Sequence, residues 1–108
     1  MRKIQQALAF IDSHLGDDLT LQHIAEALCV SPHHFAHVFR QAVGVAPHQY
    51  VIRRRVERAK ELLDTTDLSI VEIALSVGCA NQSHFSALFH RATGLTPHSY
   101  RAARQAKR

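Results

Sequence analysis

The sequence lacks the features that would place the chain in a membrane or outside the cell. None of its apolar runs approaches the ~20 residues that a membrane-spanning helix needs. No signal peptide is visible at its start. There are only two cysteines, Cys29 and Cys79. We interpret both as small core residues in a reducing compartment, not as a disulfide. The expected location is therefore the cytoplasm.

A strand pattern and a catalytic constellation are also missing. No segment shows the alternation of apolar and polar residues that is typical of a half-buried strand. The sequence contains no nucleophile placed beside a base, no phosphate-binding loop and no paired carboxylates. We therefore expect an all-α protein that is not an enzyme and needs no cofactor.

Acidic residues are fewer than basic ones, and the basic ones are unevenly distributed. The 108 residues carry a net charge of +4, before nine histidines are counted. One basic cluster lies in mid-chain and a second closes the sequence: Arg53, Arg54, Arg55, Arg58 and Lys60, then Arg101, Arg104, Lys107 and Arg108. This balance suits a polyanionic partner.

One pattern occurs twice along the chain. Three residues of the first copy (Leu19, Ile24 and Ala25) recur 49 residues later. The second copy then has one extra residue in its turn. After that, nine residues of the first copy recur 50 residues later: Cys29, His34, Phe35, Phe39, Ala42, Gly44, Pro47, His48 and Tyr50. A repeat of this length indicates one supersecondary unit used twice. Here the unit is a short helix, a tight turn and a second helix, the arrangement that presents a helix to the major groove of DNA.

Apolar periodicity and capping residues predict seven helices. The expected spans are 2–14, 21–28, 32–43, 47–63, 70–77, 82–93 and 97–104. Start signals are Thr20, Ser31 before Pro32, Asn81, and a capping box formed by Ser69 and Glu72. The second helix of each copy has an apolar stripe that we expect to be buried: Phe35, Val38, Phe39 and Ala42, then Phe85, Leu88, Phe89 and Ala92.

These residues resemble a known family, the AraC/XylS-type bacterial transcription regulators. The second copy carries the family's C-terminal signature: Ile73-Ala74, Gly78, Ser83-His84-Phe85-Ser86, Phe89, Gly94, Thr96-Pro97 and Tyr100-Arg101. The first copy and residues 55–63 also fit, so the resemblance covers nearly the whole chain. One departure is Cys79, where the family usually has phenylalanine. The resemblance implies one DNA-binding domain over 1–108: lobe 1 at about 1–46, a linking helix at about 47–63, and lobe 2 at about 64–108.

The resemblance and the helical periodicity together indicate which residues are candidates for contact with DNA. On the helix over 32–43, the face opposite the apolar stripe holds His33, Ala36, His37 and Arg40. His33 and His37 suit guanine, Ala36 suits close approach or a thymine methyl, and Arg40 suits the DNA backbone.

On the helix over 82–93 the same face holds Gln82, Ser83, Ser86, Ala87 and His90. Gln82 suits adenine, Ser83 and Ser86 are adaptable donors or acceptors, and His90 suits the backbone. With no arginine or lysine assigned to this face, we expect the second lobe to contribute affinity and shape reading more than base discrimination.

Arg53, Arg54 and Arg101 are further candidates for contact with the DNA backbone. A linking helix of about 16 residues is ~24 Å long. We expect it to place the two recognition helices about one DNA turn, ~34 Å, apart. One monomer would then read an asymmetric site.

Other interpretations remain open at this stage. The polar helix faces could be only solvated, and a helix-turn-helix that binds protein is the alternative function. His33 and His37 are four residues apart, a spacing compatible with two metal ligands, but no third ligand is placed nearby and we expect no metal site. We expect the chain to be a fragment of a longer regulator, monomeric itself but dimeric in full length through an N-terminal domain, with RNA polymerase as a further candidate partner.

Overall fold

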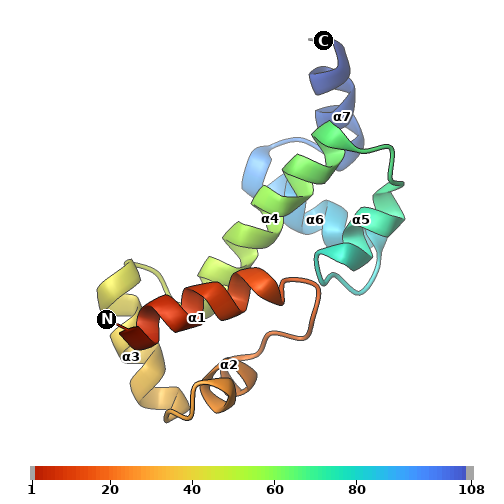
Figure 1. Ribbon diagram of the computed structural model, residues 1–108. Coiled ribbons are helices and arrows are strands. Elements are labelled where there is room, and N and C mark those ends of the chain that lie inside the picture. The colour runs from red at the N-terminus through yellow and green to blue at the C-terminus, as the bar shows by residue number, and fades with distance from the viewer. Residues whose placement is uncertain (1, 107–108) are drawn as a thin grey trace. The chain divides into compact units, whose positions relative to one another are not determined.

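The computed structural model describes residues 2–106, which form seven α-helices and no strand (Figure 1). The all-α expectation is thus confirmed. The helices are α1 (Arg2–Ser13), α2 (Leu21–Ala27), α3 (Pro32–Val43), α4 (Pro47–Thr65), α5 (Ile70–Ser76), α6 (Gln82–Thr93) and α7 (Pro97–Ala106). Within the described range, none of them combines the length and apolarity needed to cross a membrane.

The chain divides into two compact units, Met1–Arg54 and Arg55–Arg108. The division falls within α4, so the first half of this helix belongs to one unit and the second half to the other. Each unit has its own apolar core: Val51 of α4 packs in the first, whereas Val56, Ala59 and Leu63 pack in the second.

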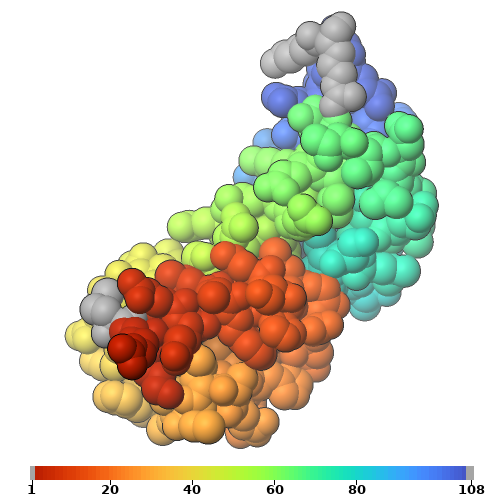
Figure 2. Space-filling model, in the orientation of Figure 1, coloured from red at the N-terminus to blue at the C-terminus, as the bar shows by residue number. Residues whose placement is uncertain are grey.

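In the first unit, α1 covers the helix pair α2 and α3. Ile4, Ala7 and Ile11 recur at helical spacing on one side of α1 and are at most 4% exposed. They pack in one cluster with Ile24 of α2 and Phe39 of α3. The space-filling view shows the atoms of α1, in red, lying directly against those of α2, in orange (Figure 2). Removing these side chains from water is the main stabilisation of this unit.

The core of the second unit repeats the aromatic arrangement of the first. Phe35 and Phe39 have ring centroids 5.6 Å apart, and Tyr50 meets Phe39 edge-on at 5.8 Å. The rings that occupy the same places in the second unit are Phe85, Phe89 and Tyr100, with separations of 5.7 and 5.4 Å. Edge-on and tilted pairs at these distances are the favourable geometries for aromatic rings. They fix which side of α3 and of α6 faces inward.

The predicted helix ends are largely confirmed. Thr20 accepts a hydrogen bond from the His23 backbone N–H, and Asn81 accepts one from that of His84. Ser69 and Glu72 form the complete capping box. Ser31 is at the N-cap position of α3, but its side chain makes no capping bond, so the predicted capping role of this side chain is wrong. Pro32 at the first helical position leaves fewer N–H groups there to satisfy.

The predicted inward positions of Ala42 and Ala92 are wrong, because both alanines are exposed. The residues after them, Val43 and Thr93, are half-buried instead, and Val43 packs against the core of its unit. The stripe that starts at Phe35 and Phe39 continues at four-residue spacing to Val43. An alanine one position earlier points about 100° away from Val43 around the helix axis.

The two cysteines do not occupy equivalent positions, which corrects the sequence alignment. Cys29 is exposed, so its predicted place in the core is wrong, whereas Cys79 is buried as predicted. The backbone N–H of Cys29 bonds to Glu26, as that of Gly78 bonds to Leu75, so Cys29 corresponds to Gly78. Val30 N–H bonds to Ala25 and Cys79 N–H to Ala74 in the same way. The extra residue of the second turn therefore follows Cys79, at Ala80, and does not precede it.

Candidate nucleic-acid interface

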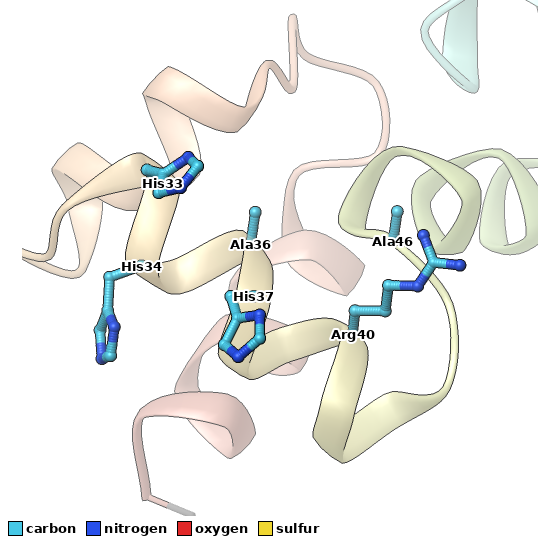
Figure 3. A pocket seen from close by; sticks show the side chains of 6 residues that line it. All are labelled: His33, His34, Ala36, His37, Arg40 and Ala46. Atoms are coloured by element: carbon cyan, nitrogen blue, oxygen red, sulfur yellow. The ribbon is translucent and has the colours of Figure 1, made fainter.

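The outer side of α3 carries a hollow lined by the residues that the sequence singled out. His33, Ala36, His37 and Arg40 line this hollow of about 510 Å³ together with His34 and Ala46. Figure 3 shows His33, His37 and Arg40 following one another along α3, with Arg40 extending towards the segment that carries Ala46. Because Phe35 and Phe39 anchor the opposite side, at 3% and 0% exposure, these polar groups are held outward.

Not every residue of this face is equally accessible. His33, His37 and Arg40 are exposed, whereas Ala36 is half-buried between them. A methyl group in that position leaves room for a partner to approach the helix backbone closely. The hollow thus combines two imidazoles that can donate or accept hydrogen bonds with a guanidinium that can only donate.

In the first unit, a lysine holds the turn between α2 and α3 in place. Lys3 of α1 donates from Nζ to the backbone carbonyl oxygen of Leu28, 2.8 Å away. Leu28 is the C-cap of α2, where carbonyl oxygens lack helical partners and attract a positive charge. This bond ties α1 to the α2–α3 turn and so helps to set the direction in which α3 leaves it.

The second unit presents a similar face on α6. Gln82, Ser83, Ala87 and His90 are exposed, and Ser86 is half-buried in the place that Ala36 takes on α3. Phe85 and Phe89, both 0% exposed, anchor the other side. The structure therefore brings these five predicted residues together on one helix face.

Sequence reasoning missed a cation on this face, Arg91. It is exposed in the last turn of α6, directly after His90. Four residues turn a helix by about 40° beyond one full turn, so Arg91 continues the line from Ser83 through Ala87. A helical wheel centred on the buried Phe85 and Phe89 would have identified it. The second helix is thus not without a strong cation.

Arg53 and Arg54, the predicted backbone contacts on α4, have different surroundings. Arg53 is exposed. Arg54 is half-buried and donates from Nε to the carboxylate of Asp12 on α1, at 2.9 Å. Arg53 is therefore accessible to a partner, whereas Arg54 already uses part of its guanidinium to join α4 to α1.

Arg101 makes a three-pronged contact inside the second unit. Its guanidinium donates to the backbone carbonyl oxygens of Leu63, Thr66 and Leu68, at 3.1, 3.1 and 2.7 Å. These carbonyls belong to the end of α4 and to the connection that leads to α5. The guanidinium of Arg101, which was predicted to contact the DNA backbone, thus already holds this connection in place. Lys107 and Arg108 of the C-terminal basic cluster lie outside the described residues.

The histidines do not assemble a metal site in the part of the chain that the structure describes. No three histidine, cysteine, aspartate or glutamate side chains within residues 2–106 are arranged to hold a metal ion. His33 and His37 instead line the α3 hollow with Arg40, a cation that would oppose a bound metal.

Two trihelical units, each with a tight turn and an outward polar helix, define a tandem helix-turn-helix protein. Comparisons with known proteins give the same class. The helix-turn-helix domain family matches residues 24–103. Regulatory protein PocR of Salmonella typhimurium is 40% identical over 76 residues, which are 70% of this chain and 25% of PocR. The chain thus spans about a quarter of that curated relative.

Solved structures resemble nearly the whole chain. The C-terminal domain of AraT, a response regulator from Geobacillus stearothermophilus, has a TM-score of 0.93 and 37% identity, covering 96% of this chain and 87% of that one. The DNA-binding domain of AdpA, a global transcriptional factor solved in complex with a target DNA, has a TM-score of 0.92 and 32% identity, covering 97% and 95%. The chain belongs to the AraC-type helix-turn-helix family of transcription regulators.

Proposed function

We propose that this chain is the sequence-specific DNA-binding domain of a transcription regulator, with α3 and α6 as its two recognition helices. The observation that carries the proposal is the α3 hollow, where His33, His37 and Arg40 are held outward by a buried aromatic anchor. The similarity to the AdpA domain, which was solved with DNA, supports it.

On α3, His33 and His37 are proposed to read bases. An imidazole N–H can donate to guanine N7 or O6, and the half-buried Ala36 between them lets a base edge or a thymine methyl come close. Arg40, in the last turn of α3, is proposed to bind a phosphate because a recognition helix reads bases mainly from its N-terminal part.

On α6, Gln82 is proposed to pair with adenine through its amide, while Ser83, Ser86 and Ala87 line the base edge. His90 is proposed to contact the backbone. For α4, Arg53 is proposed as a phosphate contact. For Arg54 and Arg101 we propose a role in holding the fold, because their guanidinium groups already bind Asp12 and three backbone carbonyls.

Selection of bound sequences from random duplex DNA tests this function. The wild-type chain should enrich one asymmetric site. His37→Ala and Gln82→Ala should each lose the preference at a different position of that site, at a cost of ~1–3 kcal/mol. Gln105→Ala, at an exposed position of α7, is the matched control and should keep the full preference. Enrichment of no sequence above bulk DNA would favour the alternative, a helix-turn-helix that binds protein.

Stoichiometry and salt dependence extend the same test. One chain per site is expected, because both recognition helices belong to one polypeptide. With ~6 phosphate contacts, the affinity should fall about a thousandfold between 50 and 200 mM salt. A second chain per site, or an affinity independent of salt, would contradict this binding mode.

Action on transcription is a proposal for the whole regulator. PocR, of which this chain matches a quarter, is named a regulatory protein. We propose that the regulator acts in the cytoplasm and influences RNA polymerase from its DNA site. Transcription in vitro from a promoter that carries the selected site, with and without the protein, measures the direction of that effect.

A further inference from the structure

From the geometry of α6 we infer that Arg91 binds a DNA phosphate and anchors the second recognition helix by charge. This inference rests on the proposed DNA-binding function and adds to it a residue and a ligand group, the phosphodiester. It also replaces the view that the second helix lacks a strong cation.

The first argument is the position of Arg91 on the helix. It lies about 6 Å further along the axis than Ala87, one turn nearer the C-terminal end. A recognition helix enters the groove with its N-terminal residues at the bases, so a long cationic side chain in the last turn is closest to the sugar–phosphate edge. Phosphate is therefore the favoured ligand of Arg91, and a base is not.

The second argument comes from the other arginines. Arg54, Arg58 and Arg104 pair with carboxylates, and Arg101 holds three carbonyls. Within residues 2–106, by contrast, no hydrogen bond or ion pair is made by the side chains of four arginines: Arg2, Arg40, Arg53 and Arg91. Of these four, Arg40 and Arg91 lie in the last turn of a proposed recognition helix. Their charge is thus available to an external anion.

The third argument is the internal repeat, which acts as a comparison within one molecule. Arg40 corresponds to His90, and Gln41 to Arg91, so the cation shifts by one residue between the two helices. One residue rotates a side chain by about 100°. The arginine of the second recognition helix is therefore expected to reach a phosphate on a different side of its helix from the one that Arg40 uses on α3.

Affinity measured against salt concentration tests the inference, using the site selected from random DNA. Arg91→Ala should bind about tenfold more weakly at low salt and lose about 0.9 from the slope of log affinity against log salt. Its defect should therefore shrink about threefold between 50 and 200 mM salt. Arg91→Lys, which keeps the charge, should recover the slope. Sequence preference should be unchanged in both variants.

Arg58→Ala is the matched control, because it removes the same charge from the same unit at a residue paired with Glu61. It should leave the slope at the wild-type value. Methylphosphonate substitution, which neutralises one phosphate of the DNA at a time, tests whether Arg91 contacts a particular phosphate. Neutralising that phosphate should weaken the binding of the wild type but not that of Arg91→Ala.

The outcomes separate this inference from the proposed function. If the wild type binds its site and Arg91→Ala shows the same salt slope as the wild type, the assignment of Arg91 is overturned and DNA binding stays intact. A lost preference at one base pair in Arg91→Ala overturns the phosphate as its ligand. If the wild-type chain prefers no duplex over bulk competitor, the proposed function fails and the inference with it.

Discussion

Cys29 and Gly78 occupy the same place in the two helix-turn-helix turns, and both have a positive φ, 58° and 86°. Each follows the C-cap residue of a seven-residue helix, and each N–H bonds three residues back. Left-handed backbone is disfavoured by a Cβ, at a cost of roughly 1–2 kcal/mol. The first unit therefore carries strain that the second unit avoids with glycine.

Cys29→Gly should stabilise the first unit by about 0.5–1 kcal/mol, the relief of this strain less the added freedom of glycine in the unfolded chain. Amide hydrogen exchange of α2 and α3 measures the effect within that unit. The reciprocal change Gly78→Ala should destabilise the second unit by about 0.5–1 kcal/mol, from the same balance of strain and unfolded-chain freedom. Equal protection in wild type and Cys29→Gly would show that the turn is not strained.

The two thiols should differ sharply in reactivity. Cys29 is exposed, whereas Cys79 is 4% exposed and burial raises the pKa of its thiol, an effect that nearby Arg55 partly opposes. A thiol reagent should therefore titrate one thiol per native chain quickly and the second only in denaturant. Cys29→Ser should abolish the fast phase. A fast phase that survives this change would contradict the burial of Cys79.

Arg101 should contribute more to stability than its neighbour Arg104. Arg101→Ala removes three hydrogen bonds from a charged donor to the α4–α5 connection, which should cost about 2–3 kcal/mol in urea unfolding. Arg101→Lys should not recover the lost stability, because an ammonium group does not reproduce the planar, forked donors of the guanidinium. Arg104→Ala, which breaks an exposed 3.4 Å contact with Asp64, is the control and should change little.

The capping box of α5 should make the second unit sensitive to acid. Hydrogen bonds from the backbone N–H and the hydroxyl of Ser69 lower the pKa of Glu72 below its ordinary value of 4.5. A lowered pKa means that the ionised carboxylate stabilises the folded state above pH 4.5. That contribution is lost as the pH falls through the lowered value.

Carboxyl titration followed by NMR should place the midpoint of Glu72 below its ordinary value of 4.5. Glu72→Gln should flatten the acid limb of the stability profile without changing the fold. Ser69→Ala should cost about 1 kcal/mol at neutral pH, as expected for the loss of an N-cap. A Glu72 midpoint at or above 4.5 would rule out the box in solution.

Features that depend on neighbours in sequence were predictable from the residues alone. The cap at Asn81, the box at Ser69 and the four-residue spacing of Phe35 and Phe39 all act within one or two helical turns. They fix where the helices begin and which side faces inward, and hence the exposure of His33 and His37. The polar face of α3 follows from the burial of the opposite side.

Features that depend on distant partners were not predictable in this way. Arg101 binds carbonyls 33 to 38 residues earlier, and Arg54 binds a carboxylate 42 residues earlier. No local pattern distinguishes these arginines from Arg53 or Arg91. The match of Cys29 to Cys79 failed for another reason. The two cysteines differ by one position when the two turns are aligned, and only the hydrogen bonds of the turns show that Cys29 corresponds to Gly78.

The single extra residue at Ala80 sets a rule for recombining the two units. A chimaera that transplants one recognition helix into the other unit keeps its register when the joint pairs structurally equivalent residues, such as the N-cap positions Ser31 and Asn81. A joint in the preceding helix that used the 50-residue offset of the recognition helices would omit one residue, because residues before the turn correspond at an offset of 49. It would rotate the grafted helix by about 100°. It would turn an anchoring phenylalanine to solvent and bury a polar side chain. The two units can therefore exchange recognition helices only at joints that respect the one-residue difference between their turns.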